Sequence, residues 1–120
     1  MAAPLRGLIA LLALAAACDR VPDHEPVTGG NPRHGKELIR QVGCGSCHTI
    51  PGIPGANATI APSLDDIAKR TYLAGRLENN PEHMMKWIRN PREVDPKTAM
   101  PELGLNDVQA RDIAAYLYSR

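Results

Sequence analysis

Apolar residues recur at helical spacing in the stretch that follows residue 31. Asn31 is a good N-cap, and Pro32 suits the first helical position, where a missing N–H has no partner to lose. The apolar positions of this stretch are Leu38, Ile39 and Val42. Gly43 is a typical residue just past a helix end. The pattern therefore predicts a first helix over residues 32–42.

Two loops rich in Pro and Gly enclose a second, shorter pattern. Residues 49–62 carry three prolines and two glycines, which predicts a loop. Ser63 then suits the cap of a short helix, with Asp66 at the third helical position in a capping-box role. The inward-facing positions of that helix are Leu64 and Ile67.

Two more helices are predicted towards the C-terminus. Asn80 and Pro81 repeat the cap-and-proline start, and that helix must stop before Pro91. Residues 91–101 are then expected to be loop. The last helix begins at Asn106, and its apolar stripe consists of Val108, Ile113, Tyr116 and Leu117.

Gly35 and the scarcity of strand patterns indicate how these helices assemble. Gly35 lies one turn before Ile39, and a missing side chain there favours close approach of another helix; a merely tolerated Gly is the alternative. Strand-like alternation is almost absent. We therefore expect an all-α domain of about four short helices.

Residues 1–17 have the organisation of an export signal. A basic region ends at Arg6, and the apolar run Leu8–Ala17 is too short for a membrane-spanning helix, which needs about 20 residues. The run that ends in Cys18 resembles a bacterial lipobox, with Ala15 where Leu is usual. We expect lipidation of Cys18 and a periplasmic protein anchored to the membrane; plain cleavage or an uncleaved anchor are the alternatives.

The segment between the leader and the first helix has the composition of a linker. Pro22, Pro26, Gly29 and Gly30 interrupt any periodicity, and the other residues are mostly polar. Residues 18–31 are therefore expected to form a flexible tether that spans at most roughly 40 Å. The folded domain is expected to comprise residues 32–120.

Composition adds one argument to this picture. The 120-residue chain is long enough for one small domain, but its aromatic content is 3% and Phe is absent. A domain with so few large side chains buries limited apolar surface, which favours a bulky cofactor at its centre. The net charge of +1 gives no argument for binding to nucleic acid.

The candidate chemistry lies in Cys44-Gly45-Ser46-Cys47-His48, a C-x-x-C-H motif typical of covalent haem attachment. Two thiols at this spacing can add to the two vinyl groups on one edge of a porphyrin. The next residue then lies under the ring, where its imidazole can bind iron. We interpret Cys44 and Cys47 as thioether anchors of one haem c and His48 as the proximal iron ligand.

Three other interpretations of the motif fit less well. A thioredoxin-like redox pair belongs in a βαβ context, which the surrounding pattern does not have. A zinc site needs four ligands, and Cys18 is too near the N-terminus to be a natural fourth. A disulfide between Cys44 and Cys47 would close a strained ring.

A second axial ligand is expected opposite His48. Met100 is the best candidate, because it lies on a loop stiffened by Pro96 and Pro101 that can cross the ring. A thioether ligand raises the reduction potential relative to a second His. The other candidates are Met84, Met85, His34 and His83. Trp87 is expected to form a flat wall of the haem site.

From residue 32 to residue 120 the sequence resembles a class I (mono-haem) cytochrome c. Gly35 and Ile39 resemble the contact pair of the family's first helix, and Ile113 and Tyr116 resemble their partners on the last helix. The resemblance implies the cytochrome c fold, with the short helices packed round one covalently bound haem.

The same resemblance assigns roles to two further segments. Ala61-Pro62-Ser63-Leu64 resembles the segment whose Pro carbonyl receives the proximal imidazole N–H, so Pro62 would orient His48. The run Lys97-Thr98-Ala99-Met100 resembles the family's distal half, with Met100 as ligand and Thr98 in the haem environment.

Within the family, the likeness is greatest to the cytochrome c domain of subunit II of caa-type cytochrome oxidases. Cys47-His48-Thr49-Ile50 and Trp87-Ile88-Arg89-Asn90-Pro91 carry it. We expect a monomeric one-electron carrier of a respiratory chain, not an enzyme, that exchanges electrons with a terminal oxidase or a bc-type complex. Lys36, Arg40, Arg92 and Lys97 are candidates for a basic rim round the exposed haem edge.

Two alternatives to a free carrier stay open from the sequence. One is a haem-containing electron-entry subunit that is permanently bound to a dehydrogenase or oxidase. The other is a gas-binding or catalytic haem protein with an open sixth position. The ligand at Met100 separates the carrier from the second alternative, because a filled sixth position leaves no site for a substrate or gas.

Overall fold

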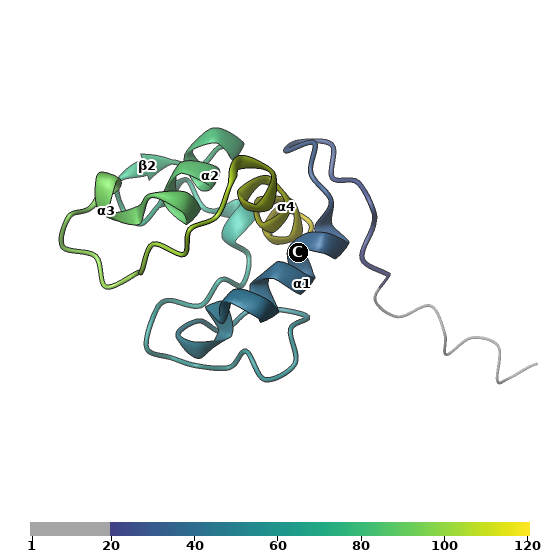
Figure 1. The fold of residues 1–120 in the computed structure, drawn as a ribbon, viewed down its shortest axis with the longest axis horizontal. Coiled ribbons are helices and arrows are strands. Elements are labelled where there is room, and N and C mark those ends of the chain that lie inside the picture. The colour runs from purple at the N-terminus through teal and green to yellow at the C-terminus, as the bar shows by residue number, and fades with distance from the viewer. Residues whose placement is uncertain (1–19) are drawn as a thin grey trace, which may run out of the picture.

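The computed structural model describes residues 20–120, which form an all-α domain with very little sheet (Figure 1). The α-helices are α1 (Pro32–Val42), α2 (Pro81–Arg89), α3 (Pro91–Val94) and α4 (Asp107–Tyr118). Two 3₁₀ turns, η1 (Cys44–Ser46) and η2 (Ile67–Lys69), and a hairpin of β1 (Tyr72–Leu73) and β2 (Leu77–Glu78) complete the elements. The expected all-α class is confirmed.

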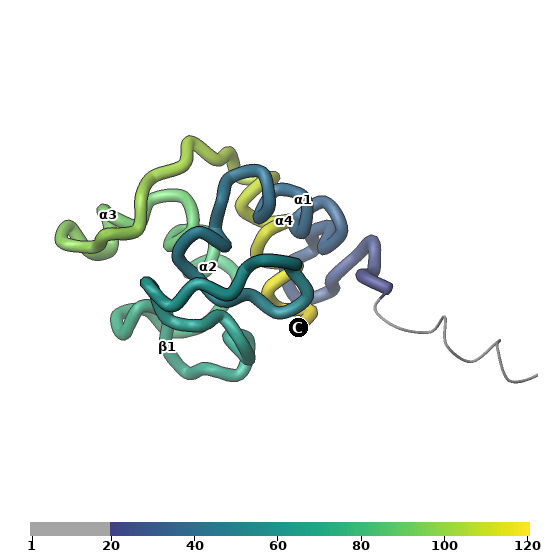
Figure 2. Tube along the Cα trace, turned by 90° about the horizontal axis from the view of Figure 1, so that it is seen from below, coloured from purple at the N-terminus to yellow at the C-terminus, as the bar shows by residue number. Residues whose placement is uncertain are grey.

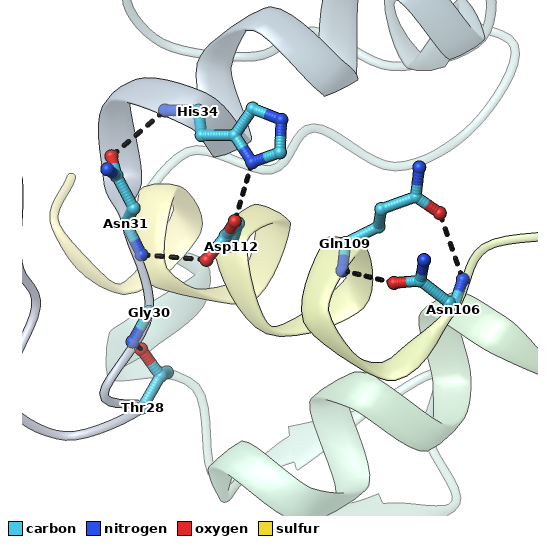
Figure 3. Close-up of polar contacts among 7 residues, drawn as sticks. All are labelled: Thr28, Gly30, Asn31, His34, Asn106, Gln109 and Asp112. Carbon is cyan, nitrogen blue, oxygen red and sulfur yellow. Dashed lines mark hydrogen bonds and ion pairs between the residues drawn. The ribbon is translucent and has the colours of Figure 1, made fainter.

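The ends of the three longer helices follow their capping residues. Asn31 Oδ1 accepts the backbone N–H of His34 at 3.0 Å, and Asn80 does the same for His83 at 2.8 Å. At α4 the side chains of Asn106 and Gln109 satisfy each other's backbone N–H groups (Figure 3). These side-chain bonds satisfy backbone N–H groups that have no carbonyl partner in the first turn of a helix. The predicted starts of the three helices are confirmed.

The packing of α1 against α4 is the central contact of the fold (Figures 1 and 2). A Cβ placed on Gly35 would overlap the carbonyl oxygen of Asp112, so only glycine permits this approach of the two backbones. Ile39 and Tyr116 are almost fully buried in the core beside it. The predicted close approach at Gly35 is therefore confirmed.

The helix predicted to start at Ser63 is wrong in its position and type. Ser63 Oγ accepts the N–H of Asp65 at 3.1 Å, but Asp66 has a left-handed backbone with φ 53°. That conformation interrupts a helical path, so only the 3₁₀ turn η2 follows. The expected inward positions hold, because Ile67 is buried and Leu64 packs against the core.

Two other details of the sequence pattern are corrected. Residues 91–101 are not all loop, since Pro91 opens the short helix α3; the sequence argument took this proline only as the stop of the preceding helix. Val108 is 57% exposed, whereas Ile113 is buried. Five residues along a helix is about 140° round its axis, so these two cannot share one narrow stripe.

The expected tether lies partly on the domain. Val21 packs against the core and Glu25 is buried, with backbone hydrogen bonds closing a turn between Glu25 and Gly30. Residues 1–17 and Cys18, with the expected leader and lipidation site, lie outside the described residues. Within residues 20–120, no helix combines the length and apolar character required to cross a bilayer.

Candidate functional site

A largely apolar cavity lies between η1, α2, α4 and the loop that precedes α4. Its volume is about 70 Å³, and it opens to solvent. Four predicted site residues line it: Cys44, His48, Trp87 and Met100. The apolar lining residues include Ile39, Ile50, Leu64, Ile67, Leu73, Met84, Ile88, Leu103, Leu105, Ile113 and Leu117.

The two thiols lie on a single tight turn at the end of α1. Gly43 adopts φ 80°, which ends α1 and directs the chain into η1. The N–H groups of Cys47 and His48 both bond to the carbonyl of Cys44, at 3.2 and 3.1 Å. Cys44 and Cys47 are free, partly buried thiols. The motif is thus folded into one compact loop, with Cys44 on the cavity wall.

Burial of Cys44 has an electrostatic consequence. Desolvation raises the pKa of this thiol above its ordinary value, and the proximity of Cys47 adds to the increase. The neutral thiol, already the main form of an ordinary cysteine at pH 7, is thereby favoured further. Among residues 20–120, no group of three or more His, Cys, Asp and Glu side chains is arranged to hold a metal ion.

His48 lines the cavity, and one of its two ring nitrogens is hydrogen-bonded. Its Nδ1 lies 2.7 Å from the carbonyl oxygen of Pro62, so Nδ1 carries the proton and donates. Nε2 then keeps its lone pair, which is the form that binds a metal. The segment before Pro62 is held in place because the N–H of Ala61 donates to the carbonyl of Cys47 at 2.8 Å.

Met100 approaches the same cavity from the loop between α3 and α4. Its backbone N–H donates to Thr98 Oγ1 at 3.1 Å, and the N–H of Thr98 donates to the carbonyl of Asp95 at 3.0 Å. These bonds shape the loop locally. Thr98 does not itself line the cavity, and its hydroxyl contacts the backbone of Met100 instead.

The rival axial ligands differ in their positions. Met84 also lines the cavity and is 2% exposed, so it is a second sulfur within the site. Met85 packs against the core and does not line the cavity. His83 lies outside it, with Nδ1 2.9 Å from the carbonyl of Glu78. His34 is engaged with Asp112 at 2.6 Å.

Two arginines for which the sequence predicted no role hold the loop that carries Met100. Arg76 pairs with Asp95 at 3.4 Å, just before the Thr98 turn. Arg89 donates to the carbonyl of Leu105 at 3.2 Å and pairs with Asp107 at the start of α4. No local pattern identifies them, because their partners lie 16 to 19 residues away along the chain.

The residues of the candidate basic rim differ in whether an acidic side chain lies beside them. Arg40 lies 3.6 Å from Glu37, one turn earlier on α1. Arg92 and Lys97 are exposed on the segment that leads to Met100. Lys69 pairs with Asp66 at 2.8 Å, and Arg70 donates to the carbonyl of Ser63.

These residues fit a covalently held porphyrin. The cavity is apolar, one thiol lies on its wall and the other on the same turn, and an imidazole beside them has a free nitrogen. Fold and site together define a c-type haem protein. The family description "Cytochrome c" matches residues 32–120, and the chain belongs to the cytochrome c family, which implies covalently bound haem c.

The relatives comprise oxidase subunits and a small cytochrome. The chain is 30% identical to cytochrome c oxidase subunit 2 of Alkalihalophilus pseudofirmus over 88 residues, 71% of this chain and 24% of that one. It is 36% identical to the subunit 2 of Bacillus sp. (strain PS3) over 66 residues, 53% of this chain and 18% of the relative. The predicted likeness to oxidase subunit II is thereby confirmed.

The match to cytochrome c-552 of Bradyrhizobium diazoefficiens is weaker in identity but longer. It has 26% identity over 115 residues, which covers 96% of this chain and 93% of the relative. By contrast, this chain spans no more than about a quarter of the length of the oxidase subunits. The similarity to those subunits therefore concerns one segment of each.

Proposed function

We propose that the protein is a mono-haem electron carrier of a respiratory chain, with His48 and Met100 as axial ligands and Cys44 and Cys47 as covalent anchors. The observation that carries this proposal is the single cavity lined by Cys44, His48 and Met100. Cys44 and His48 belong to one segment, and Met100 lies 52 residues after His48 in the sequence. A haem bound there would supply an iron that gains and loses one electron.

The protein's own residues would keep the site constant during that exchange. The carbonyl oxygen of Pro62 accepts a hydrogen bond from His48 Nδ1–H, which fixes the tautomer and orientation of the ring. Thr98 and the Arg76–Asp95 pair hold the loop of Met100. Ligands that do not move between oxidation states minimise the reorganisation that electron transfer requires, and two filled axial positions leave none for a substrate.

The apolar walls of the cavity would also keep the site constant during electron exchange. Trp87 and Met84 belong to α2, and Ile113 and Leu117 reach the cavity from α4. Such walls exclude water from the site, and burial is one of the factors that set a haem's reduction potential.

Localisation and partners belong to the same proposal. A lipid on Cys18 would anchor the protein on the periplasmic side of a bacterial membrane, as a monomer that exchanges electrons with a cytochrome oxidase or a bc-type complex. The similarity to proteins named cytochrome c oxidase subunit 2 supports an oxidase as partner. The same similarity also supports the second candidate, a stable subunit of an oxidase or dehydrogenase, which co-purification at native abundance would reveal.

Optical spectroscopy of the mature protein tests the proposal. In alkaline pyridine, the denatured protein should show the spectrum of a haem with two thioether links, and the native ferrous protein should bind carbon monoxide slowly and incompletely. Rapid, stoichiometric binding would favour a gas-binding or catalytic protein. A colourless protein after correct secretion and maturation would rule out both.

A further inference from the structure

Residues 21–31, which we call the N-terminal strap, fold back on the domain instead of leaving it. Figure 1 shows this purple segment turning beside α4 before it enters α1. Val21 packs against the hydrophobic core, and Asp23 pairs with Arg33 of α1 at 2.9 Å. The strap therefore has one apolar and one ionic contact with the domain before its central turn.

The central turn of the strap is organised by a buried carboxylate. Glu25 is 6% exposed, and its two oxygens accept the N–H groups of Val27 and Thr28 at 2.9 and 2.7 Å and the Thr28 hydroxyl at 2.7 Å. The backbone N–H of Glu25 donates to the carbonyl of Gly30 at 3.0 Å. These bonds give the turn a defined shape that can dock as a unit.

The end of the turn is fastened to α4. A Cβ on Gly30 would lie 2.7 Å from the carbonyl oxygen of Arg111 and 2.9 Å from Cβ of Ala115, so the strap backbone lies directly on that helix. The N–H of Asn31 donates to the buried carboxylate of Asp112 at 2.8 Å (Figure 3). The strap is thus held by both shape and a buried hydrogen bond.

We infer that the docked strap shortens the membrane tether and keeps the domain close to the bilayer. This inference rests on the proposed anchor at Cys18. A free chain from Cys18 to Asn31 could reach at most roughly 40 Å, whereas three residue steps from Cys18 to the docked Val21 can span at most about 10 Å. In Figures 1 and 2, α3 lies at the end of the domain opposite to the strap. The segment that leads to Met100 therefore lies at the end of the domain away from the anchor point.

The docking of the strap can be tested without a membrane. In the soluble Cys18→Ala holoprotein, an endopeptidase that cleaves before Asp should cut at Asp23 at least about tenfold more slowly than in a Gly30→Val version, whose side chain would collide with α4. Gly29→Asn is the matched control, because nothing lies within 4 Å of its Cβ and Asn tolerates the φ of 73°. Equal cleavage of all three proteins would overturn the docking.

Hydrogen exchange gives a measurement that needs no strap variant. The amides of Thr28 and Asn31 should exchange at least about tenfold more slowly than their sequence alone predicts. Unprotected amides in a protein with an intact haem spectrum would overturn the docked strap, whatever the fate of Gly30→Val.

The shortened tether is tested on lipidated holoprotein in phosphatidylcholine–phosphatidylglycerol vesicles that carry a fluorophore on their headgroups. Energy transfer to haem should be stronger for the natural protein than for Gly30→Val or for a protein with ten Gly/Ser residues inserted after Asp19. Equal transfer in all three would overturn the short tether. Failure to bind vesicles at all would overturn the anchor, and the short tether with it, while slow cleavage at Asp23 would still support the docked strap.

Discussion

The imidazole of His48 and the sulfur of Met100 place different demands on the chain. His48 is fixed by its neighbour in the motif and by one hydrogen bond to Pro62. Met100 depends on a loop held by the Thr98 turn and by ion pairs from β-hairpin and helix residues. These contacts involve the loop backbone and other side chains, not the sulfur of Met100. Removing that sulfur should therefore leave the loop and the motif around His48 intact.

We therefore predict that Met100→Ala keeps its covalent haem but loses the sulfur–iron charge-transfer band in the far red of the ferric spectrum. The opened position should bind carbon monoxide stoichiometrically. Met85→Ala is the control, since Met85 packs against the core outside the cavity and should keep the band. Persistence of the band in Met100→Ala, with its loss in Met84→Ala, would transfer the ligand to Met84.

Glu25 predicts a specific dependence of stability on pH. Burial alone would raise its pKa, but hydrogen bonds from the Thr28 side chain and the backbone of Val27 and Thr28, with a smaller effect of His24, lower the pKa below its ordinary value. The folded state therefore binds this proton less readily than the unfolded chain. The stabilisation is complete above the unfolded-state pKa of about 4.3 and is lost as pH falls through the folded-state pKa.

Glu25→Gln should accordingly lower the free energy of unfolding by about 1–2 kcal/mol at pH 7. The difference between the two proteins should shrink progressively below about pH 4.3. Guanidinium titrations of ferric holoprotein at several pH values measure both quantities. Glu78→Gln, at an exposed side chain, should show neither effect. A difference that stays constant down to pH 3 would contradict the role given to the carboxylate.

Residues that act through local chemistry were predictable, and residues that act through distant partners were not. The thiols and imidazole of the motif adjoin each other in the sequence, so their spacing alone indicates haem. Asp112 accepts from Asn31 and His34, which lie 81 and 78 residues away. Glu25 lies near Tyr118 at the end of α4, where burial and then the charge of Glu25 raise the pKa of the phenol. The hydrophobic pattern of the sequence does not predict such pairs, because only the folded chain brings these residues together.

At the scale of elements, the long helices were predictable because their ends are determined locally. Caps such as Asn106 and stops such as Gly43 act within one turn. The short elements η2 and α3 have too few hydrogen bonds to be stable by themselves, so tertiary contacts determine where they form. The error at Ser63 and the missed helix at Pro91 are both of this kind.

The contact between α1 and α4 predicts a severe effect of one methyl group. Gly35→Ala should lower the free energy of unfolding by about 3 kcal/mol, since the added Cβ overlaps the Asp112 carbonyl and the helices must separate. Gln41→Ala, on the exposed side of the same helix, should change it by less than about 0.5 kcal/mol. Guanidinium unfolding of the holoproteins provides the comparison. Equal stability of the two variants would mean that the helices adjust without cost.

At the scale of the whole molecule, charge distribution governs encounters with other proteins. Several cations among the described residues have an acidic partner, as in the pairs Lys69–Asp66, Lys86–Glu93 and Arg33–Asp23. Within residues 20–120, no ion pair involves Arg92 or Lys97, which are exposed on the segment leading to Met100. Their positive charge is therefore available to an acidic partner that approaches this end of the domain.

Electron exchange with an acidic redox protein should consequently slow by roughly 3- to 10-fold as ionic strength rises from about 0.01 to 0.15 M. Replacing Arg92 and Lys97 together with Gln should weaken this response, because both exposed cations of the segment leading to Met100 are removed. The control is Lys69→Gln with Asp66→Asn, which removes a cation and its partner together and should leave the salt response unchanged. Stopped-flow measurements would report the rates. An unaltered salt response in the Arg92 and Lys97 double variant would place the docking surface elsewhere, and the strap side of the domain would then have to be tested with Arg33→Gln.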